Sequence, residues 1–293
     1  MARFLIVGSI ARDEVVRLRT ALRAGGHLEG IPSGARLGGG AACTAVPLAH
    51  AGHQVTVVSA VGTDPAGDWL LARLVAMGVD VSQVCRVEGE STRSIVMVDE
   101  TGERTIVNLV RAQESEPPRR VLDLPADCLY VRSRAPGLAP ILSEKARSCL
   151  VVAHIPPCDE GARPAQVLVA SEYDLDPASR AEPWKTGRHV AGDRLEWVVL
   201  THGPEGAEAF GAEARLRAAA KAVRARDTTG SGDAFAAGLI HALVAGGSMR
   251  AALETGVAWG AESARSLSSV LPAEAVERLL ASPLGPASDA PDT

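Results

Sequence analysis

Short apolar runs alternate with amphipathic stretches along most of the chain. Residues 4–7 and 55–60 are continuous apolar runs of strand length, while residues 41–51 and 66–77 carry apolar side chains at helical spacing. Further runs of strand length lie at residues 128–131, 150–153, 167–170 and 197–201. Because strands that alternate with helices usually form parallel sheets, the pattern predicts an α/β fold built on a mostly parallel sheet.

The alternation breaks between residues 84 and 109. Residues 94–98 and 105–107 are two short apolar runs on either side of a polar turn at residues 99–103, a pattern that is typical of a hairpin. With the polar segment at residues 17–37, this hairpin would form a small sheet lying over a site.

A glycine-containing loop runs into a helical pattern at residues 226–246. Gly230 and Gly232 flank Ser231, so the backbone can approach a ligand closely, and the free N–H groups of a helix start favour a phosphate. Asp233 lies on the first helical turn, where a carboxylate beside an anion site suggests a proton acceptor. The same residues are equally compatible with simple helix capping, because the helix dipole alone favours an acidic side chain there.

Ligands collect outside the carboxyl ends of the strands in open α/β sheets. Asp13 comes just after the strand at residues 4–7, where its carboxylate could accept hydrogen bonds from hydroxyl groups or could be a solvated loop residue. Residues 200–206 combine a strand end with a glycine turn, which is a second place of this kind.

Three consecutive glycines, Gly38 to Gly40, precede the helical run at residues 41–51 and make another point of close backbone approach. Pro47 lies inside that run, where its ring would clash with the carbonyl group of Cys43. We therefore expect a kink or a displaced start in this helix.

Composition narrows the class of protein. The 293 residues are 46% hydrophobic, which suffices for a sizeable core, and the net charge of −5 with few aromatic residues argues against nucleic-acid binding. The five cysteines contain no Cys-x-x-Cys pair, so neither a disulfide framework nor a zinc site is indicated. No apolar run approaches the about 20 residues of a membrane span, and the first residues do not resemble a signal peptide, so we expect a cytoplasmic protein.

Taken together, these motifs resemble those of the ribokinase-like carbohydrate kinases, the PfkB family, over nearly the whole chain. The stretch at residues 227–233 looks like the C-terminal signature of that family, and residues 38–52 look like its N-terminal signature. The resemblance implies a mostly parallel sheet with helices on both faces and a small β lid, here residues 13–37 and 84–109. Residues 1–282 would form this single domain, and residues 283–293 would be a disordered tail.

The resemblance also implies a role for each matching position. ATP with Mg²⁺ would phosphorylate a small sugar, and some relatives also bind a monovalent cation such as K⁺. Apart from the resemblance, the unpaired strand edges of the exposed lid sheet favour a homodimer through the lid. Asp233 would be the catalytic base, and the amides of Gly230, Ser231 and Gly232 would stabilise the transferred phosphoryl group. The substrate would contact Asp13, Gly38, Gly39 and Cys43. The nucleotide and its metal would lie near Ser171, Asp174, Thr201, Gly203 and Gly206, and a monovalent cation near Asp227 and Thr229.

Several positions depart from the family pattern. Cys43 replaces a common Asn, and Ser171 and Asp174 replace an Asn and a Glu. These changes keep open a nucleoside or phosphosugar as substrate, and a binding or regulatory protein with little activity. Arg93, Arg104 and Arg134 are candidates for holding an anionic substrate. The stronger alternative is that they have no such role, because arginine is abundant in this chain and Arg104 follows a turn that the family shares whatever the substrate. No Tyr or Trp lies in the expected lid segments, which favours a simple sugar or sugar acid over a nucleoside.

Overall fold

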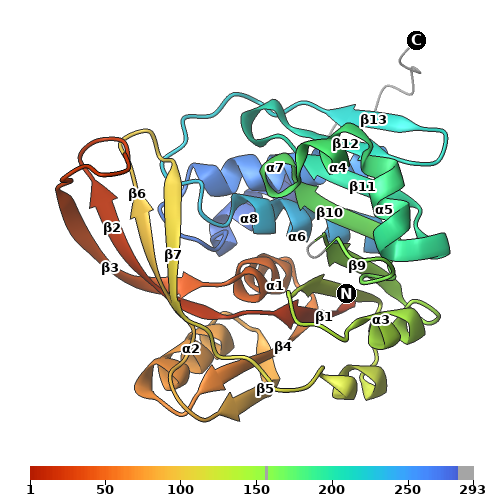
Figure 1. Cartoon of the computed structure of the whole chain (residues 1–293), viewed down its shortest axis with the longest axis horizontal. Coiled ribbons are helices and arrows are strands. Elements are labelled where there is room, and N and C mark those ends of the chain that lie inside the picture. The colour runs from red at the N-terminus through yellow and green to blue at the C-terminus, as the bar shows by residue number, and fades with distance from the viewer. Residues whose placement is uncertain (156–157, 283–293) are drawn as a thin grey trace.

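The computed structural model describes residues 1–155 and 158–282 and has two sheets, a large central one and a smaller one beside it (Figure 1). The tail expected at residues 283–293 lies outside the described residues. The strands are β1 Arg3–Gly8, β2 Ala11–Leu18, β3 Gly30–Gly38, β4 Gln54–Gly62, β5 Asp80–Val87, β6 Arg93–Val98, β7 Arg104–Val110, β8 Cys128–Arg132, β9 Leu150–His154, β10 Val167–Ser171, β11 Trp197–Thr201, β12 Ala207–Phe210 and β13 Arg215–Ala218. The helices are α1 Gly40–His50, α2 Pro65–Ala76, α3 Ala139–Lys145, α4 Pro177–Ala181, α5 Pro183–Ala191, α6 Ser231–Val244, α7 Met249–Ala264 and α8 Ala273–Ala281.

The central sheet has nine strands in the order β13-β12-β11-β10-β9-β8-β1-β4-β5. Every pairing from β11 through to β5 is parallel, and β12 and β13 add an antiparallel edge. The expected α/β fold with a mostly parallel sheet is therefore confirmed. Because parallel strands all end at the same edge, this topology gathers several strand ends around one region.

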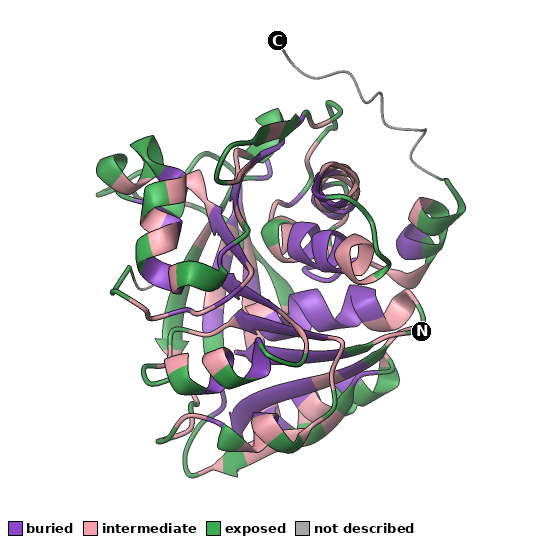
Figure 2. Cartoon of the chain, turned by 90° about the vertical axis from the view of Figure 1, so that its right-hand side faces the viewer, coloured by how far each residue is buried: buried purple, intermediate pink, exposed green. Residues whose placement is uncertain are grey.

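Both faces of this sheet are covered, which explains the continuous apolar runs in its strands. Along β1, Phe4 and Ile6 pack into a cluster with helices α1, α6 and α7, while Leu5 and Val7 pack into a second cluster with α3 and α5. Successive side chains of a strand point to opposite faces, so a fully apolar strand is buried on both. Figure 2 shows the buried strands in the middle of the molecule with helices on either side.

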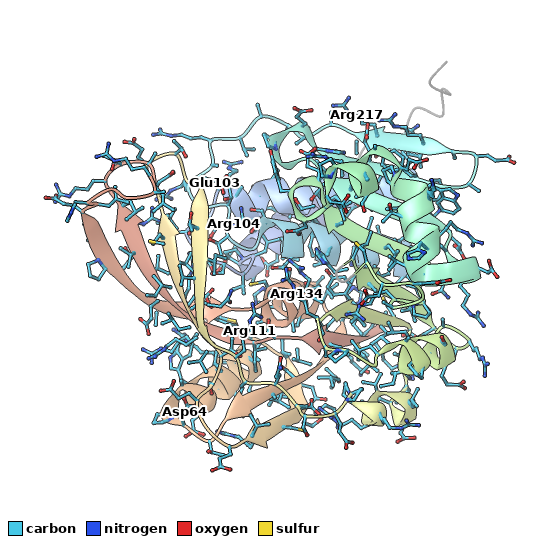
Figure 3. The ribbon with its side chains drawn as sticks, viewed as in Figure 1. Asp64, Glu103, Arg104, Arg111, Arg134 and Arg217 are labelled. Carbon is cyan, nitrogen blue, oxygen red and sulfur yellow. The ribbon has the colours of Figure 1, made fainter. Side chains whose placement is uncertain are left out.

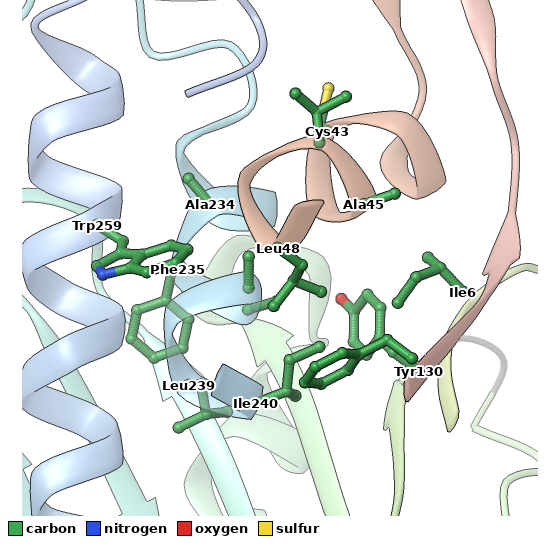
Figure 4. Packing of buried hydrophobic residues seen from close by; sticks show 14 of the residues in the cluster. Ile6, Cys43, Ala45, Leu48, Tyr130, Ala234, Phe235, Leu239, Ile240 and Trp259 are labelled. Carbon is green, nitrogen blue, oxygen red and sulfur yellow. The ribbon is translucent and has the colours of Figure 1, made fainter. Parts of the chain in front are cut away.

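Helix α6 packs closely against α1 and α7, which fixes its position over the sheet (Figure 4). A Cβ atom on Gly238 would lie 2.8 Å from the Trp259 ring, and one on Gly256 would lie 2.9 Å from the Phe235 ring. Glycine at these two positions therefore lets α6 and α7 approach each other. The first turn of α6, with Asp233, is in this way held by a rigid core.

The small sheet has the order β3-β2-β6-β7, with β2 and β6 parallel and the other two pairings antiparallel. We call this sheet the lid. The expected hairpin is present as β6 and β7. The lid does not include all of the residues expected from the sequence. Residues 84–87 belong to β5, which pairs with β4 in the central sheet.

Helix α1 begins at Gly40 and includes Pro47, so its start is not displaced. In the described ranges, no helix is both long enough and apolar enough to cross a bilayer.

Candidate active site

A cavity of about 580 Å³ lies between the lid and the central sheet. Its walls come from the carboxyl ends of β1, β8 and β9, from the lid strands β2, β6 and β7, and from the starts of α1 and α6. Of the residues expected in the site, those lining the cavity are Asp13, Gly39, Cys43, Asp174, Thr229, Gly230 and Asp233. The fold therefore brings the two glycine-rich motifs together although they lie far apart in the sequence.

The start of α6 carries Asp233 at the edge of the cavity. Gly230 precedes this helix with φ 80°, and a Cβ atom there would lie 2.0 Å from the carbonyl oxygen of Ser269. Only glycine fits this left-handed and crowded position. Arg132 donates a hydrogen bond from Nε to Oδ1 of Asp233 at 3.3 Å. Ser231 and Gly232 belong to the same first turn, whose amides lack partners within the helix.

Asp13 projects from β2 and is buried, with a relative exposure of 5%. Burial raises its pKa to about 6, although the neighbouring Arg36 opposes this rise. Gly38 explains how the carboxyl group fits, because a Cβ atom at Gly38 would lie 1.9 Å from Oδ2 of Asp13. Gly38 thus makes room for Asp13 and does not itself line the cavity.

The other glycines of this motif have similar roles. Gly39 has φ 89°, and a Cβ atom there would lie 2.4 Å from the carbonyl oxygen of Ser9. A Cβ atom at Gly40 would lie 2.3 Å from Cγ of Arg132. Cys43 lies one turn along α1, fully buried, and burial raises the pKa of its thiol well above the ordinary value. The Cys43 side chain is therefore a neutral, small wall of the cavity.

Asp174 contacts His154, which ends β9, with 3.5 Å between Oδ2 and Nε2. This hydrogen bond lowers the pKa of Asp174, while burial lowers the pKa of His154. Asp174 is therefore an ionised carboxylate at the cavity wall. Ser171 instead accepts a hydrogen bond from the amide of Tyr173 at 3.4 Å and lies outside the cavity.

The expected nucleotide contacts at the end of β11 do not line this cavity. Thr201 is the last residue of β11, and Gly203 and Gly206 lie in the turn that follows it. Thr201 pairs with Ser171 in the register of β10 and β11, so both expected nucleotide contacts lie at neighbouring strand ends. His202 in this turn is only 19% exposed and lies 3.0 Å from Glu172 and 3.5 Å from Glu208. His202 therefore faces these two carboxylates rather than open solvent.

Asp227 and Thr229 were expected at a monovalent-cation site. Oδ1 of Asp227 accepts a hydrogen bond from the amide of Thr229 at 2.9 Å, and Oδ2 accepts one from Nη1 of Arg36 at 2.6 Å. Nη1 of Arg36 also donates to the carbonyl oxygen of Leu267 at 3.0 Å. The Asp227 carboxylate is thus already paired with a positive charge.

Sequence reasoning missed Arg132 and His154. Arg132 is the last residue of β8 and His154 is the last residue of β9. Both strands are parallel and buried, and both residues lie at the edge of the sheet where ligands collect. The strand-end rule that selected Asp13 would have found them too.

Two of the three arginines that the sequence suggests for an anionic substrate lie at the cavity. Arg104 and Arg134 line the cavity, as does Arg111, which the sequence did not single out. Figure 3 shows these three residues grouped in the middle of the molecule, between the lid and the central sheet. Arg93 lies outside the cavity, 3.9 Å from Glu90 at the surface.

The pfkB family carbohydrate kinase profile matches residues 1–135 and 154–275 of this chain. An ATP-dependent ribose-1-phosphate kinase of Halopiger xanaduensis is 30% identical over 280 residues, covering 90% of this chain and 92% of its own length. Among solved structures, ribokinase of Thermotoga maritima has a TM-score of 0.77 at 22% identity, with 96% of this chain and 100% of that chain covered. Ribokinase of Cryptococcus neoformans, in complex with ADP, has a TM-score of 0.67 at 21% identity, with 95% and 99% covered.

The family profile spans most of the chain, the Halopiger relative aligns over nearly its full length, and the ribokinase structures share the fold. The chain therefore belongs to the pfkB family of carbohydrate kinases and is an ATP-dependent kinase.

Proposed function

We propose that this kinase transfers the γ-phosphoryl group of ATP to a hydroxyl group of a phosphorylated sugar, with Asp233 as the general base. Asp233 would take the proton of the acceptor hydroxyl as the new bond from that oxygen to the γ-phosphorus forms. The bond between the γ-phosphorus and the bridging oxygen breaks, and ADP leaves. The amides of Gly230, Ser231 and Gly232 lie at the N-terminal end of α6, where they would stabilise the charge on the transferred group.

Asp174 fits a role beside the nucleotide. Its ionised carboxylate lines the same cavity as Asp233, and Mg²⁺ in kinases is held by one or two carboxylates together with the phosphates. Bound in this way, Mg²⁺ would neutralise phosphate charge, and Ser171, Thr201, Gly203 and Gly206 would lie along the nucleotide.

The observation that carries the anionic acceptor is the pair Arg111 and Arg134. Both line the cavity, and among the residues that the structure describes neither forms an ion pair with a carboxylate, although the charge of Arg134 helps to lower the pKa of Asp174. By contrast Arg104 contacts Glu103 at 3.2 Å, and Arg132 contacts Asp233. Guanidinium groups that are not held in a direct ion pair suit a phosphate, since they bind it bidentately. The Halopiger relative is described as a kinase of ribose 1-phosphate, which is an acceptor of this chemistry.

A nucleoside acceptor is less well supported. No Phe, Tyr or Trp of the described residues lines the cavity, so a base would have no ring on which to stack. A binding protein without activity would not need the arrangement of Asp233 beside an anion-binding helix start.

The test is an acceptor panel scored by ADP release and by ³¹P NMR of the product. The panel contains ribose, fructose, adenosine and ribose 1-phosphate. We expect turnover with the sugar phosphate, and a rise in its KM of about 10-fold to 100-fold in Arg111→Ala and Arg134→Ala. Arg93→Ala is the matched control, because Arg93 is a lid arginine outside the cavity.

Preference for an uncharged sugar, with KM values unchanged in the two cavity variants, would refute the anionic acceptor and leave the sugar kinase activity in place. No product with any acceptor, despite tight ligand binding, would favour a regulatory protein.

We also propose that the protein forms a homodimer through the lid. Residues that line the cavity, such as Asp13 and Ile106, lie on one face of the lid, so the alternating residues lie on the other. On this outer face Val107 is 42% exposed and Leu109 is 47% exposed. An exposed apolar face on a sheet is an association surface, and a second copy would cover it symmetrically.

A further inference from the structure

Arg36 links the lid to the loop that precedes α6. It lies on β3 opposite Asp13 of β2, and its Nη1 atom contacts both the carboxylate of Asp227 and the carbonyl oxygen of Leu267. The Arg36 side chain is 14% exposed, and the Asp227 side chain is 0% exposed. A single buried guanidinium group therefore joins three segments that are distant in the sequence.

The loop at residues 227–230 is built around this carboxylate. Asp227 accepts the amide hydrogen of Thr229, and Gly230 lies against the carbonyl oxygen of Ser269. A fully buried carboxylate is stable only when a positive charge or several donors compensate it. Arg36 supplies that charge, so it holds the loop that places Gly230 and the first amides of α6 at the cavity.

A monovalent cation does not fit beside Asp227. Both carboxylate oxygens already accept hydrogen bonds, and the Leu267 carbonyl oxygen, a further candidate ligand, accepts one from Arg36. A K⁺ ion at these oxygens would also lie next to the guanidinium charge, which it would repel.

We propose that Arg36 is a positioning residue that takes the place of a bound monovalent cation, so that this kinase works without K⁺. The guanidinium group fixes the 227–230 loop from the lid side, and the enzyme needs no ion from solution for that purpose. The activity measurements that test this inference rest on the proposed function. The stability measurements do not depend on it.

The experiment compares the wild-type protein with Arg36→Ala in tetramethylammonium chloride, in KCl and with added guanidinium. We expect the wild-type rate to differ by less than about twofold between the two salts. In Arg36→Ala, kcat/KM should fall at least about tenfold in tetramethylammonium chloride, and K⁺ or guanidinium should restore much of it. The assay is run at pH 8, because loss of Arg36 would raise the pKa of Asp13.

Thermal denaturation in the same salts gives a readout that needs no turnover. K⁺ should raise the Tm of Arg36→Ala more than the Tm of the wild type or of Arg93→Ala, a lid arginine at the surface. The double variant Arg36→Ala with Asp227→Asn should lose this response, because no buried carboxylate remains to be compensated. If Arg36→Ala does not fold in tetramethylammonium chloride, recovery of folding in KCl is the expected result.

Two results would overturn the proposal. One is strong K⁺ activation of the wild-type protein, or an equal K⁺ effect on Tm in wild type and Arg36→Ala. The other is an Arg36→Ala variant that folds in neither salt while the double variant folds. A wild-type protein without turnover on any acceptor would contradict the proposed function instead, and the Tm comparison would still decide the role of Arg36.

Discussion

Asp233 is the residue on which the proposed chemistry depends most. Replacement by Asn keeps the size of the side chain but removes its ability to accept a proton, so we expect kcat to fall by about 10²-fold to 10⁴-fold. ATP affinity should stay near the wild-type value, because the α6 amides remain in place. Kinetics and calorimetry with a non-hydrolysable ATP analogue would measure the two effects.

Asp123→Asn is a suitable control for that measurement. Asp123 is an exposed carboxylate outside the cavity. Near-native turnover of Asp233→Asn would show that another group accepts the proton.

Asp13 should give the enzyme a pH dependence. Burial raises its pKa to about 6, and the ionised carboxylate accepts hydrogen bonds from acceptor hydroxyl groups more strongly than the neutral acid does. We therefore expect kcat/KM for the acceptor to fall by up to about tenfold per pH unit below about pH 6. Asp13→Asn should be weakly active and should lack this limb of the profile.

The same raised pKa predicts that the stability of the fold falls as the pH rises, whereas the activity rises. The native state binds more protons than the unfolded state between about pH 4 and pH 6, so stability falls as pH rises through that range. At pH 7.5 Asp13→Asn should therefore be more stable than the wild type, by up to about 3 kcal/mol, and the difference should shrink at pH 4.5. A variant that is less stable than wild type at both pH values would show that the Asp13 carboxylate is not strained by burial.

Sequence reasoning recovered the residues that local motifs define and missed those that pair over long distances. Asp13 follows the apolar strand at residues 4–7, and Asp233 follows a glycine motif, so both signals are visible in the chain. The partners Arg132 and Arg36 lie 101 and 191 positions from Asp233 and Asp227, so no local pattern connects them. The sequence predicts a cation site at Asp227, and no local pattern indicates that the lid places Arg36 beside that carboxylate.

At the level of elements, the central strands were predictable because burial on both faces makes them continuously apolar. The edge strands β12 and β13 were missed, since each is four residues long and includes charged side chains. The apolar pattern of β5 is also interrupted, because it is an edge strand with several exposed positions, and it was assigned in part to the lid. Helix α1 accommodates Pro47 in a segment buried from residue 41 to residue 48, so tertiary packing outweighs the local cost of proline.

At the level of the whole molecule, the lid contacts the body near the 227–230 loop through β3 and through the hairpin of β6 and β7, and Nη1 of Arg104 donates a hydrogen bond to Oγ1 of Thr228 there. Arg36 of β3 forms an ion pair with Asp227, and the carbonyl oxygen of Gly102 in the hairpin accepts the amide hydrogen of Thr228 at 3.1 Å. Asp13 on β2 and the 227–230 loop therefore belong to one connected unit. This arrangement leaves the outer face of the lid as the part of the small sheet that is free to contact another molecule.

That outer face supports the last prediction, which concerns the homodimer. Val16, Ile95, Met97 and Val107 share it by strand alternation, and β7 is an edge strand with unpaired backbone groups. Val107→Lys should convert a dimer into a monomer, because it places a charge in an apolar interface that two copies share. Light scattering coupled to size exclusion would measure the mass over a range of concentrations.

Val75→Lys is the matched control, since Val75 is 58% exposed on α2 and lies outside the lid. A wild-type protein that is monomeric at every concentration, or a dimer that survives Val107→Lys, would contradict the proposal. Because the cavity opens on the other face of the same sheet, the monomeric variant should also show a higher KM for the acceptor than the Val75→Lys control. In the monomer only one face of the four-stranded lid is covered. The lid then buries less apolar surface than in the dimer and holds Asp13 and Arg36 less firmly, which would raise the KM.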